Sequence, residues 1–382
     1  MKKRKFVVCI VAMFVTLFCY GQEFKHDGSV YKILSENEVE LIRLNRKGLH
    51  SKIKLSSWVK RRGKTYRVTS IHPNFVPLFS KRMDMFSLTL PECLTSVTKY
   101  NFSSLGLTRL VVPQSVRKIE PYSFAHMPYL IDVELGDSIQ TIEHHAFSGD
   151  GDLHWVRLGK GVERIHFSAF NLCRNLFRIN LDLVKYIGCR AFENTDLDSI
   201  SLESLERVDS AAFSRCRGLQ SVTFSEKLKY IGDRAFACNS AMRSLFIPAD
   251  SIGIGAFLDC SSLNEVYMTD QVKYMGEKVF FMCTGLNSVL LSNNISVLND
   301  GVFAGCLNLR DIELPKSLTY IGKYAFAKTG LESLIIPKSV IFIDDGAFKN
   351  CSDLRKVFIA NPNIKLGKDV FDKKVQIEYR EM

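Results

Sequence analysis

Residues 303–326 read FAGCLNLRDIELPKSLTYIGKYAF, and units of this layout recur along most of the 382-residue chain. Each unit ends on the phenylalanine that begins the next one. From the second phenylalanine onward, the interval is 21, 22 or 23 residues. The series is Phe75, Phe102, Phe124, Phe147, Phe170, Phe192, Phe213, Phe236, Phe257, Phe280, Phe303, Phe326, Phe348 and Phe371. A fixed period in the range of about 20 to 50 residues indicates a solenoid, in which one structural unit repeats along an axis.

A single unit predicts one strand and one tight corner. Residues 309–314 end in period-2 alternation, which indicates a half-buried strand, and Pro315 ends its ladder. Ile321 and Gly322 then lead into a short helical turn that carries Ala325 and Phe326. The small alanine lets neighbouring coils approach while the ring fills the interior.

Burial within one unit cannot offset the entropy lost when that unit is ordered. About six core side chains contribute roughly 1.5 to 3 kcal/mol each. Ordering about 22 residues costs roughly 1 to 2 kcal/mol per residue in backbone entropy. Stacking of units is therefore obligatory, and neighbouring strands are expected to form a parallel sheet.

The motif Ile-Gly-x-x-Ala-Phe is found at residues 231–236 and again at 321–326. With the cysteine and leucine that follow it, this pattern resembles the BspA-type leucine-rich repeat over about residues 71–375. The resemblance implies a mostly-β α/β solenoid with a parallel β-sheet along one face. The array would contain about 12 to 13 coils of 21–23 residues.

The chain is expected to comprise four segments. Residues 1–21 have a basic start and an apolar run, which predicts a signal peptide cleaved after Gly21. A lipidated Cys19 is the alternative, and the run is too short to favour a membrane anchor. Residues 22–70 are a predicted β-rich N-terminal cap, 71–360 the repeats, and 361–382 a last partial repeat with a C-terminal cap strand. The protein is thus expected to be exported and to be secreted, on the cell surface or periplasmic.

The net charge of +11 is not spread along the chain. Four basic residues belong to the predicted signal peptide, residues 22–70 hold 12 Lys or Arg against 5 acids, and residues 71–382 hold 35 of each. The repeats are therefore neutral, which argues against a nucleic-acid partner. The basic cluster Lys60, Arg61, Arg62 and Lys64 is either a solvated turn or a contact for an acidic surface.

Cysteines recur in one column of the repeat, three residues after the phenylalanine. Thr195 and Thr329 occupy the same column, and threonine forms no disulfide, so a packing and hydrogen-bonding role is favoured. Oxidised pairs between adjacent coils remain an alternative. The residues predicted to be structural are Phe124, Phe147, Phe170, Phe192, Phe213, Phe236, Phe257, Phe280, Phe303, Phe326, Phe348, Cys173, Cys216, Cys260, Cys283, Cys306 and Cys351.

Candidate ligand-binding residues lie at outward positions of the predicted strands. Phe246, Tyr267 and Leu290 are consecutive in the stack and predict an exposed apolar patch. Trp155, Arg157 and Arg178 form a second candidate cluster, with residue types enriched in protein interfaces. The alternative is that β-propensity alone selects these side chains.

Sequence motifs for catalysis are absent: there is no GxSxG, HExxH, phosphate-binding loop or dinucleotide fingerprint. The chain is therefore expected to be no enzyme and to use no cofactor or metal. The resemblance implies an exported bacterial binding protein, adhesin-like or a scaffold, whose partner is a protein such as a host matrix or surface protein. The alternative is a glycan-binding component of an envelope polysaccharide-handling system, with Trp155 and Tyr267 as stacking platforms.

Overall fold

The computed structural model describes residues 21–45, 52–72, 75, 86–97, 102 and 106–379. The chain divides into two compact units, Met1–Val162 and Glu163–Met382. The predicted signal peptide lies outside the described residues, apart from its last residue, Gly21. The four predicted segment boundaries stay predictions.

The first unit begins with a five-stranded sheet in the order β1-β2-β3-β6-β5. Its strands alternate buried and exposed residues, so that Tyr31, Val39 and Val68 face one apolar core. The hairpin β5–β6 turns at Arg62 and Gly63, both with positive φ. The strands are β1 (Glu23–His26), β2 (Ser29–Ile33), β3 (Glu38–Arg43), β5 (Trp58–Arg61) and β6 (Lys64–Ile71).

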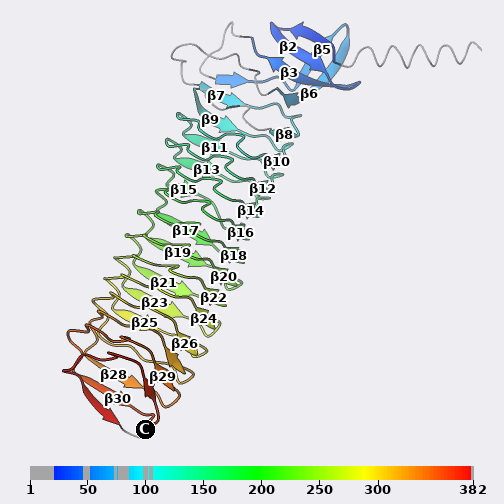
Figure 1. The fold of residues 1–382 in the computed structure, drawn as a ribbon. Coiled ribbons are helices and arrows are strands. Elements are labelled where there is room, and N and C mark those ends of the chain that lie inside the picture. The colour runs from blue at the N-terminus through cyan, green and yellow to red at the C-terminus, as the bar shows by residue number, and fades with distance from the viewer. Residues whose placement is uncertain are drawn as a thin grey trace, which may run out of the picture. The chain divides into compact units, whose positions relative to one another are not determined.

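The rest of the first unit consists of stacked coils that contribute strands to two parallel columns (Figure 1). The first column is β4 (Lys52–Lys54), β7 (Phe86–Thr89), β9 (Leu107–Val111), β11 (Asp132–Glu134) and β13 (Trp155–Arg157). The second column is β8 (Ser96–Val97), β10 (Lys118–Ile119) and β12 (Thr141–Ile142).

The second unit has the same two-column layout. Its first column is β15 (Arg178–Ile179), β17 (Ser199–Leu202), β19 (Ser221–Phe224), β21 (Ser244–Ile247), β23 (Glu265–Met268), β25 (Ser288–Leu290), β28 (Ser333–Ile336), β30 (Lys356–Ile359) and β32 (Gln376–Tyr379). Its second column is β14 (Arg164–Ile165), β16 (Tyr186–Ile187), β18 (Arg207–Val208), β20 (Tyr230–Ile231), β22 (Ser251–Ile252), β24 (Tyr274–Met275), β26 (Val297–Leu298), β27 (Tyr320–Ile321), β29 (Phe342–Ile343) and β31 (Lys365–Leu366). The predicted mostly-β solenoid with parallel strands is confirmed.

The predicted helical turn before each phenylalanine is wrong, because none of the described residues lies in a helix. In the turn around Phe326, every second N–H group bonds the next coil: Tyr324 to Asp345 O (3.2 Å) and Phe326 to Ala347 O (2.8 Å). The intervening N–H groups bond backward, as Ala325 does to Gly322 O. Tyr324 adopts a φ of 55°. A helix needs successive N–H groups to bond within the segment, and here half of them join adjacent coils.

The phenylalanines form a stacked ladder inside each unit. In the second unit, ring centroids of successive phenylalanines from Phe170 to Phe371 lie 5.0 to 5.7 Å apart, with interplanar angles between 3° and 19°. In the first unit, Phe102, Phe124 and Phe147 follow one another at 5.2 Å. Residues from Phe75 to Phe348 in this series are fully buried.

The cysteine column hydrogen-bonds one coil to the next. Within the second unit, five cysteine Sγ atoms each donate to the carbonyl of the phenylalanine one coil earlier, at 3.1 to 3.2 Å: Cys216, Cys260, Cys283, Cys306 and Cys351. Asn239 takes the same role with its Nδ2, at 3.0 Å from Phe213 O. Burial raises the pKa of Cys216 to about 12, so its thiol stays protonated. Every cysteine in the described part of the chain is free.

The first strand column of the second unit is interrupted between β15 and β17, between β19 and β21, and at the coil between β25 and β28. Residues 309–314, predicted to be a strand, are not one. Among the described residues, no backbone group of 311–314 makes a hydrogen bond to a neighbouring coil.

A charge at one outward position accounts for the strand that is missing at residues 309–314. Asp132-Val133-Glu134 has the same pattern as Asp311-Ile312-Glu313 and does form a strand, β11. There, Glu134 is held by Arg157 at 2.6 Å and by Arg109 at 3.6 Å on the flanking strands. Glu313 has no ion pair among the described residues, and the corresponding positions of its neighbouring coils are Leu290 and Ile335. A carboxylate between two apolar side chains is a poor cross-strand neighbour, and the ladder opens.

Substitution of two phenylalanines, one buried in the ring ladder and one exposed on β21, tests the inward assignment of the ladder. Phe236→Ala is expected to lower the free energy of unfolding by about 3 to 5 kcal/mol, because it leaves a cavity between two stacked rings. Phe246→Ala, on the exposed face, is expected to change it by less than about 0.5 kcal/mol. Urea unfolding followed by circular dichroism measures both, and equal effects would contradict the inward assignment.

Candidate binding surface

Three large apolar side chains lie exposed and adjacent on the first strand column of the second unit. Phe246 on β21, Tyr267 on β23 and Leu290 on β25 are aligned as direct cross-strand partners. Their exposed fractions are 51%, 41% and 55%. Parallel strands lie about 4.8 Å apart, so the three side chains are contiguous. We call them the apolar patch.

The rim of the apolar patch is polar. Ser244, Glu265 and Ser288 occupy the other outward position of the same three strands and are exposed. The Tyr267 hydroxyl donates to Glu265 Oε2 at 3.1 Å, and this hydrogen bond raises the pKa of Tyr267. An apolar centre with a polar rim is the usual anatomy of a protein interface.

The second predicted cluster is divided between the two units. Trp155 and Arg157 lie on β13 in the first unit, where Trp155 is half-buried and Arg157 is held by Glu134. Arg178 lies exposed on β15 in the second unit. Because Glu134 neutralises Arg157, the part of this cluster in the first unit offers less free charge than the sequence suggested.

The second strand column carries an alternation of arginine and tyrosine that the sequence reasoning missed. The Arg164 guanidinium lies over the Tyr186 ring at 4.5 Å, and Arg207 lies over Tyr230 at 4.8 Å. Asp209 accepts from Tyr186 at 2.6 Å and from Arg207 at 2.7 Å. A comparison of the residues just before each repeat isoleucine would have revealed this alternation in the sequence. These side chains satisfy one another, which favours a structural role.

The pKa of Tyr186 is raised to about 12, mainly by burial and secondly by the hydrogen bond to Asp209. Tyr320 repeats the arrangement with Asp344 at 2.7 Å, and its pKa is also raised to about 12. The same hydrogen bond lowers the pKa of Asp344. These tyrosines therefore stay neutral donors and do not serve as bases at physiological pH.

The basic cluster of the N-terminal sheet is partly engaged. Arg61 lies over the Phe24 ring at 5.2 Å and donates to Gln22 Oε1. Lys64 lies near Glu36 at 3.5 Å. Both side chains therefore have partners within the N-terminal sheet. These contacts favour the solvated turn over a contact for an acidic surface.

No group of three or more His, Cys, Asp or Glu side chains with metal-binding geometry occurs in the described part of the chain. Asp150 is buried: its Oδ1 accepts the Met127 N–H at 2.7 Å, and its Oδ2 has no partner. Burial raises the pKa of Asp150 well above its ordinary value. It occupies the repeat position that cysteine fills elsewhere, three residues after Phe147.

Comparison with known proteins identifies the repeat. The model of the BspA type leucine rich repeat region matches in six copies, over residues 74–178, 146–262, 185–306 and 273–381. The chain belongs to the BspA-type leucine-rich repeat family. The resemblance inferred from the repeat motif is therefore confirmed.

Solved structures of other leucine-rich repeat proteins resemble this BspA-type chain. One from Bacteroides ovatus is 21% identical, with a TM-score of 0.73, and the match covers 94% of this chain and 99% of that one. A leucine rich cell surface protein from Faecalibacterium prausnitzii is 20% identical, with a TM-score of 0.43 and coverage of 89% and 95%. A search of the curated proteins gave no match.

Family and fold together show a leucine-rich repeat scaffold. Within the described residues, the structure contains no helix with the length and apolarity needed to cross a membrane.

The buried Asp150 predicts a pH-dependent stability of the first unit. Its folded pKa is raised above the unfolded value, so its contribution to stability is fully present below the unfolded pKa, about 3.9, and is lost as pH rises through the folded pKa. Asp150→Asn keeps the acceptor for Met127 and removes the buried charge. We expect it to raise the free energy of unfolding by about 1 to 3 kcal/mol at pH 7.

The gain from Asp150→Asn should shrink toward pH 4, where the native carboxyl is protonated. Urea unfolding of both proteins at the two pH values measures the difference. Asp152→Asn, two residues away and exposed, is the matched control. A gain that is the same at both pH values would contradict a buried, titrating Asp150.

Proposed function

We propose that the chain is an exported, non-enzymatic binding protein, adhesin-like or a scaffold, which recognises protein partners through the first strand column. The apolar patch of Phe246, Tyr267 and Leu290 is the proposed contact centre. The observation that carries the proposal is the alignment of three exposed, large apolar side chains on adjacent strands. A contiguous apolar area with a polar rim supports association with another protein surface.

The rigidity of the scaffold supports the same proposal. Beneath the apolar patch, Leu245 and Val266 are buried against the core, so the backbone that presents the patch is fixed by packing. A preorganised surface loses little conformational entropy on binding. Tyrosine and phenylalanine are also rigid side chains with large contact areas.

Chemistry provides no competing centre in the described residues. The tyrosines and cysteines with shifted pKa values are held in their neutral forms by burial and hydrogen bonding. A catalytic site would instead show nucleophiles or bases shifted toward reactivity. Recognition by shape is therefore the favoured use of the fold.

The double variant Phe246→Ser, Tyr267→Ser tests the proposal. We expect at least a tenfold loss of capture of a protein ligand from host extracts or envelope fractions, because both central anchors of the interface are removed. The measurement is a pull-down with quantitative mass spectrometry, followed by titration of the captured protein. Folding is checked by thermal unfolding.

Tyr274→Ser with Leu307→Ser is the matched control, because these two side chains are as exposed as those of the apolar patch and lie off the first strand column. The control variant should retain the ligand. Equal loss in both variants would contradict a specific patch. Binding to a glycan array that disappears with Trp155→Ala would overturn the protein-ligand proposal in favour of glycan recognition.

A further inference from the structure

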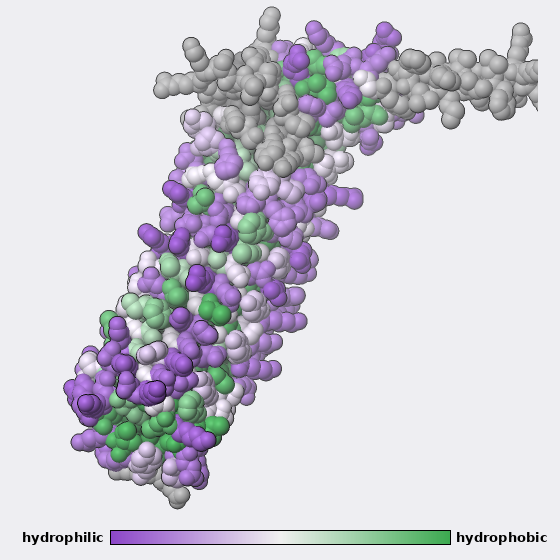
Figure 2. Space-filling model, in the orientation of Figure 1, coloured by the Kyte–Doolittle hydropathy of each residue, from purple (hydrophilic) through white to green (hydrophobic). Residues whose placement is uncertain are grey.

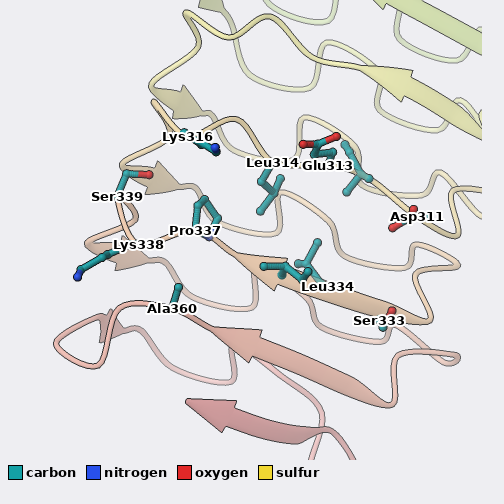
Figure 3. A pocket seen from close by; sticks show the side chains of 12 residues that line it. Asp311, Glu313, Leu314, Lys316, Ser333, Leu334, Pro337, Lys338, Ser339 and Ala360 are labelled. Carbon is teal, nitrogen blue, oxygen red and sulfur yellow. The ribbon is translucent and has the colours of Figure 1, made fainter. Parts of the chain in front are cut away.

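A hollow of about 760 Å³ opens beside the interrupted coil of the second unit. One wall is the irregular segment 311–316 and the other is β28 with the turn that follows it, residues 333–339 (Figure 3). We call this hollow the slot. Its volume lies within the range of ligand sites, about 300 to 1,000 Å³.

The slot has an unsatisfied backbone wall. In the described part of the chain, the N–H and C=O groups of residues 311–314 bond neither coil beside them. The strand β28 is paired with β30 on its other side only, so its edge toward the slot is also unpaired. Unpaired strand edges are templates for pairing with another extended chain.

The opening is confined to this face of the coil. Inside the same coil, Phe303 and Phe326 remain stacked at 5.4 Å. On the second strand column, β26, β27 and β29 pair without interruption. The coil is therefore held on two sides, and the slot is open in a protein that is otherwise folded.

Charges of opposite sign lie at the two ends of the slot. Lys316 and Lys338 are at one end, and Asp311 is at the other beside Ser333 (Figure 3). Leu314, Leu334 and Pro337 lie between the two ends, and the acidic Glu313 lines the slot beside Leu314. Neither lysine forms an ion pair with a described residue. Apolar side chains also gather on the surface near β28 and β30 (Figure 2).

We propose that the slot binds an extended peptide segment of a partner protein as an added parallel strand between residues 311–314 and β28. Segment 311–316 and β28 both run from the acidic end to the lysine end, so a parallel peptide places its N-terminal side at Asp311. The bound segment has a basic residue there, an acidic residue or a terminal carboxylate at Lys316 and Lys338, and an apolar residue between them.

This inference goes beyond the proposed function, because it uses none of the residues of the apolar patch and names a different mode of recognition. Main-chain hydrogen bonds supply the affinity, and the two charged ends supply direction. An extended segment of four residues is about 13 Å long. A partner could use either surface alone.

Hydrogen exchange tests whether the slot is open. Amides of residues 312–314 are expected to exchange at least 100-fold faster than those of the equivalent strand residues 266–268, which are paired in the ladder. The variant Glu313→Val should slow the exchange of 312–314, because valine fits between Leu290 and Ile335 and lets the strand form. Slow exchange of 312–314 in the unaltered protein would overturn the proposal.

Peptide binding tests the occupant. The probe is an acetylated, fluorescently labelled six-residue peptide with lysine first, glutamate last and alternating valine and threonine between them. Its matched control has glutamate first and lysine last. Fluorescence anisotropy should give saturable binding of the first peptide and at least tenfold weaker binding of the second. Equal affinity of the two peptides, or no saturable binding of the first, would overturn the proposal.

Three variants and one modified peptide separate the slot from other surfaces. Lys316→Glu with Lys338→Glu should reverse the preference between the two peptides, whereas Lys227→Glu with Lys229→Glu, the same charge change on a remote coil, should leave it unchanged. Glu313→Val should weaken binding at least tenfold while raising stability. N-methylation of the peptide backbone should abolish binding, because a strand needs its N–H groups.

The apolar patch variant Phe246→Ser, Tyr267→Ser distinguishes the two proposals. Its binding of the peptide should equal that of the unaltered protein, whatever happens to capture of a protein ligand. Loss of peptide binding in this variant would overturn the slot as the binding site. Loss of protein capture together with intact peptide binding would support both surfaces independently.

Discussion

The phenylalanine of each coil is buried because the next coil stacks its own ring upon it. Ring spacings of 5.0 to 5.7 Å in the second unit are close to the separation of about 4.8 Å between paired strands. The strand columns of the repeats have the same period as this ring ladder. A phenylalanine ring between two others becomes exposed to solvent if either neighbouring coil is removed. The stability of the fold therefore resides in the interfaces between coils.

The corner that carries each phenylalanine is stabilised twice. Alternate N–H groups of the turn bond the next coil, and the side chain three residues later donates back to the previous coil. This second interaction explains why cysteine and asparagine are interchangeable there, since each has a short donor side chain. Threonine at the same position donates to the phenylalanine carbonyl of its own coil. Asp150 occupies the same position as an acceptor: its Oδ1 accepts the Met127 N–H, and burial raises its pKa.

Binding surfaces form only at positions that the interior packing of the coils does not constrain. Outward positions on the first strand column vary from charged to aromatic because nothing inside the coil depends on them. The apolar patch results from three such positions on consecutive strands. The slot lies beside Glu313, which lacks the arginine partners that hold Glu134. Both surfaces lie in the second unit, on coils whose interior ladder is continuous.

Sequence by itself determined the period, the buried phenylalanines, the donor column and the alternation that exposes Phe246, Tyr267 and Leu290, because each depends on residues within one repeat. Only the tertiary structure decided three further features. The corners are turns and not helical, since half of their N–H groups bond across coils. The pairing of Arg207 with Tyr230 depends on residues one period apart. The strand expected at residues 309–314 is lost because a strand forms only where an adjacent coil pairs with it, and that depends on residues of neighbouring coils.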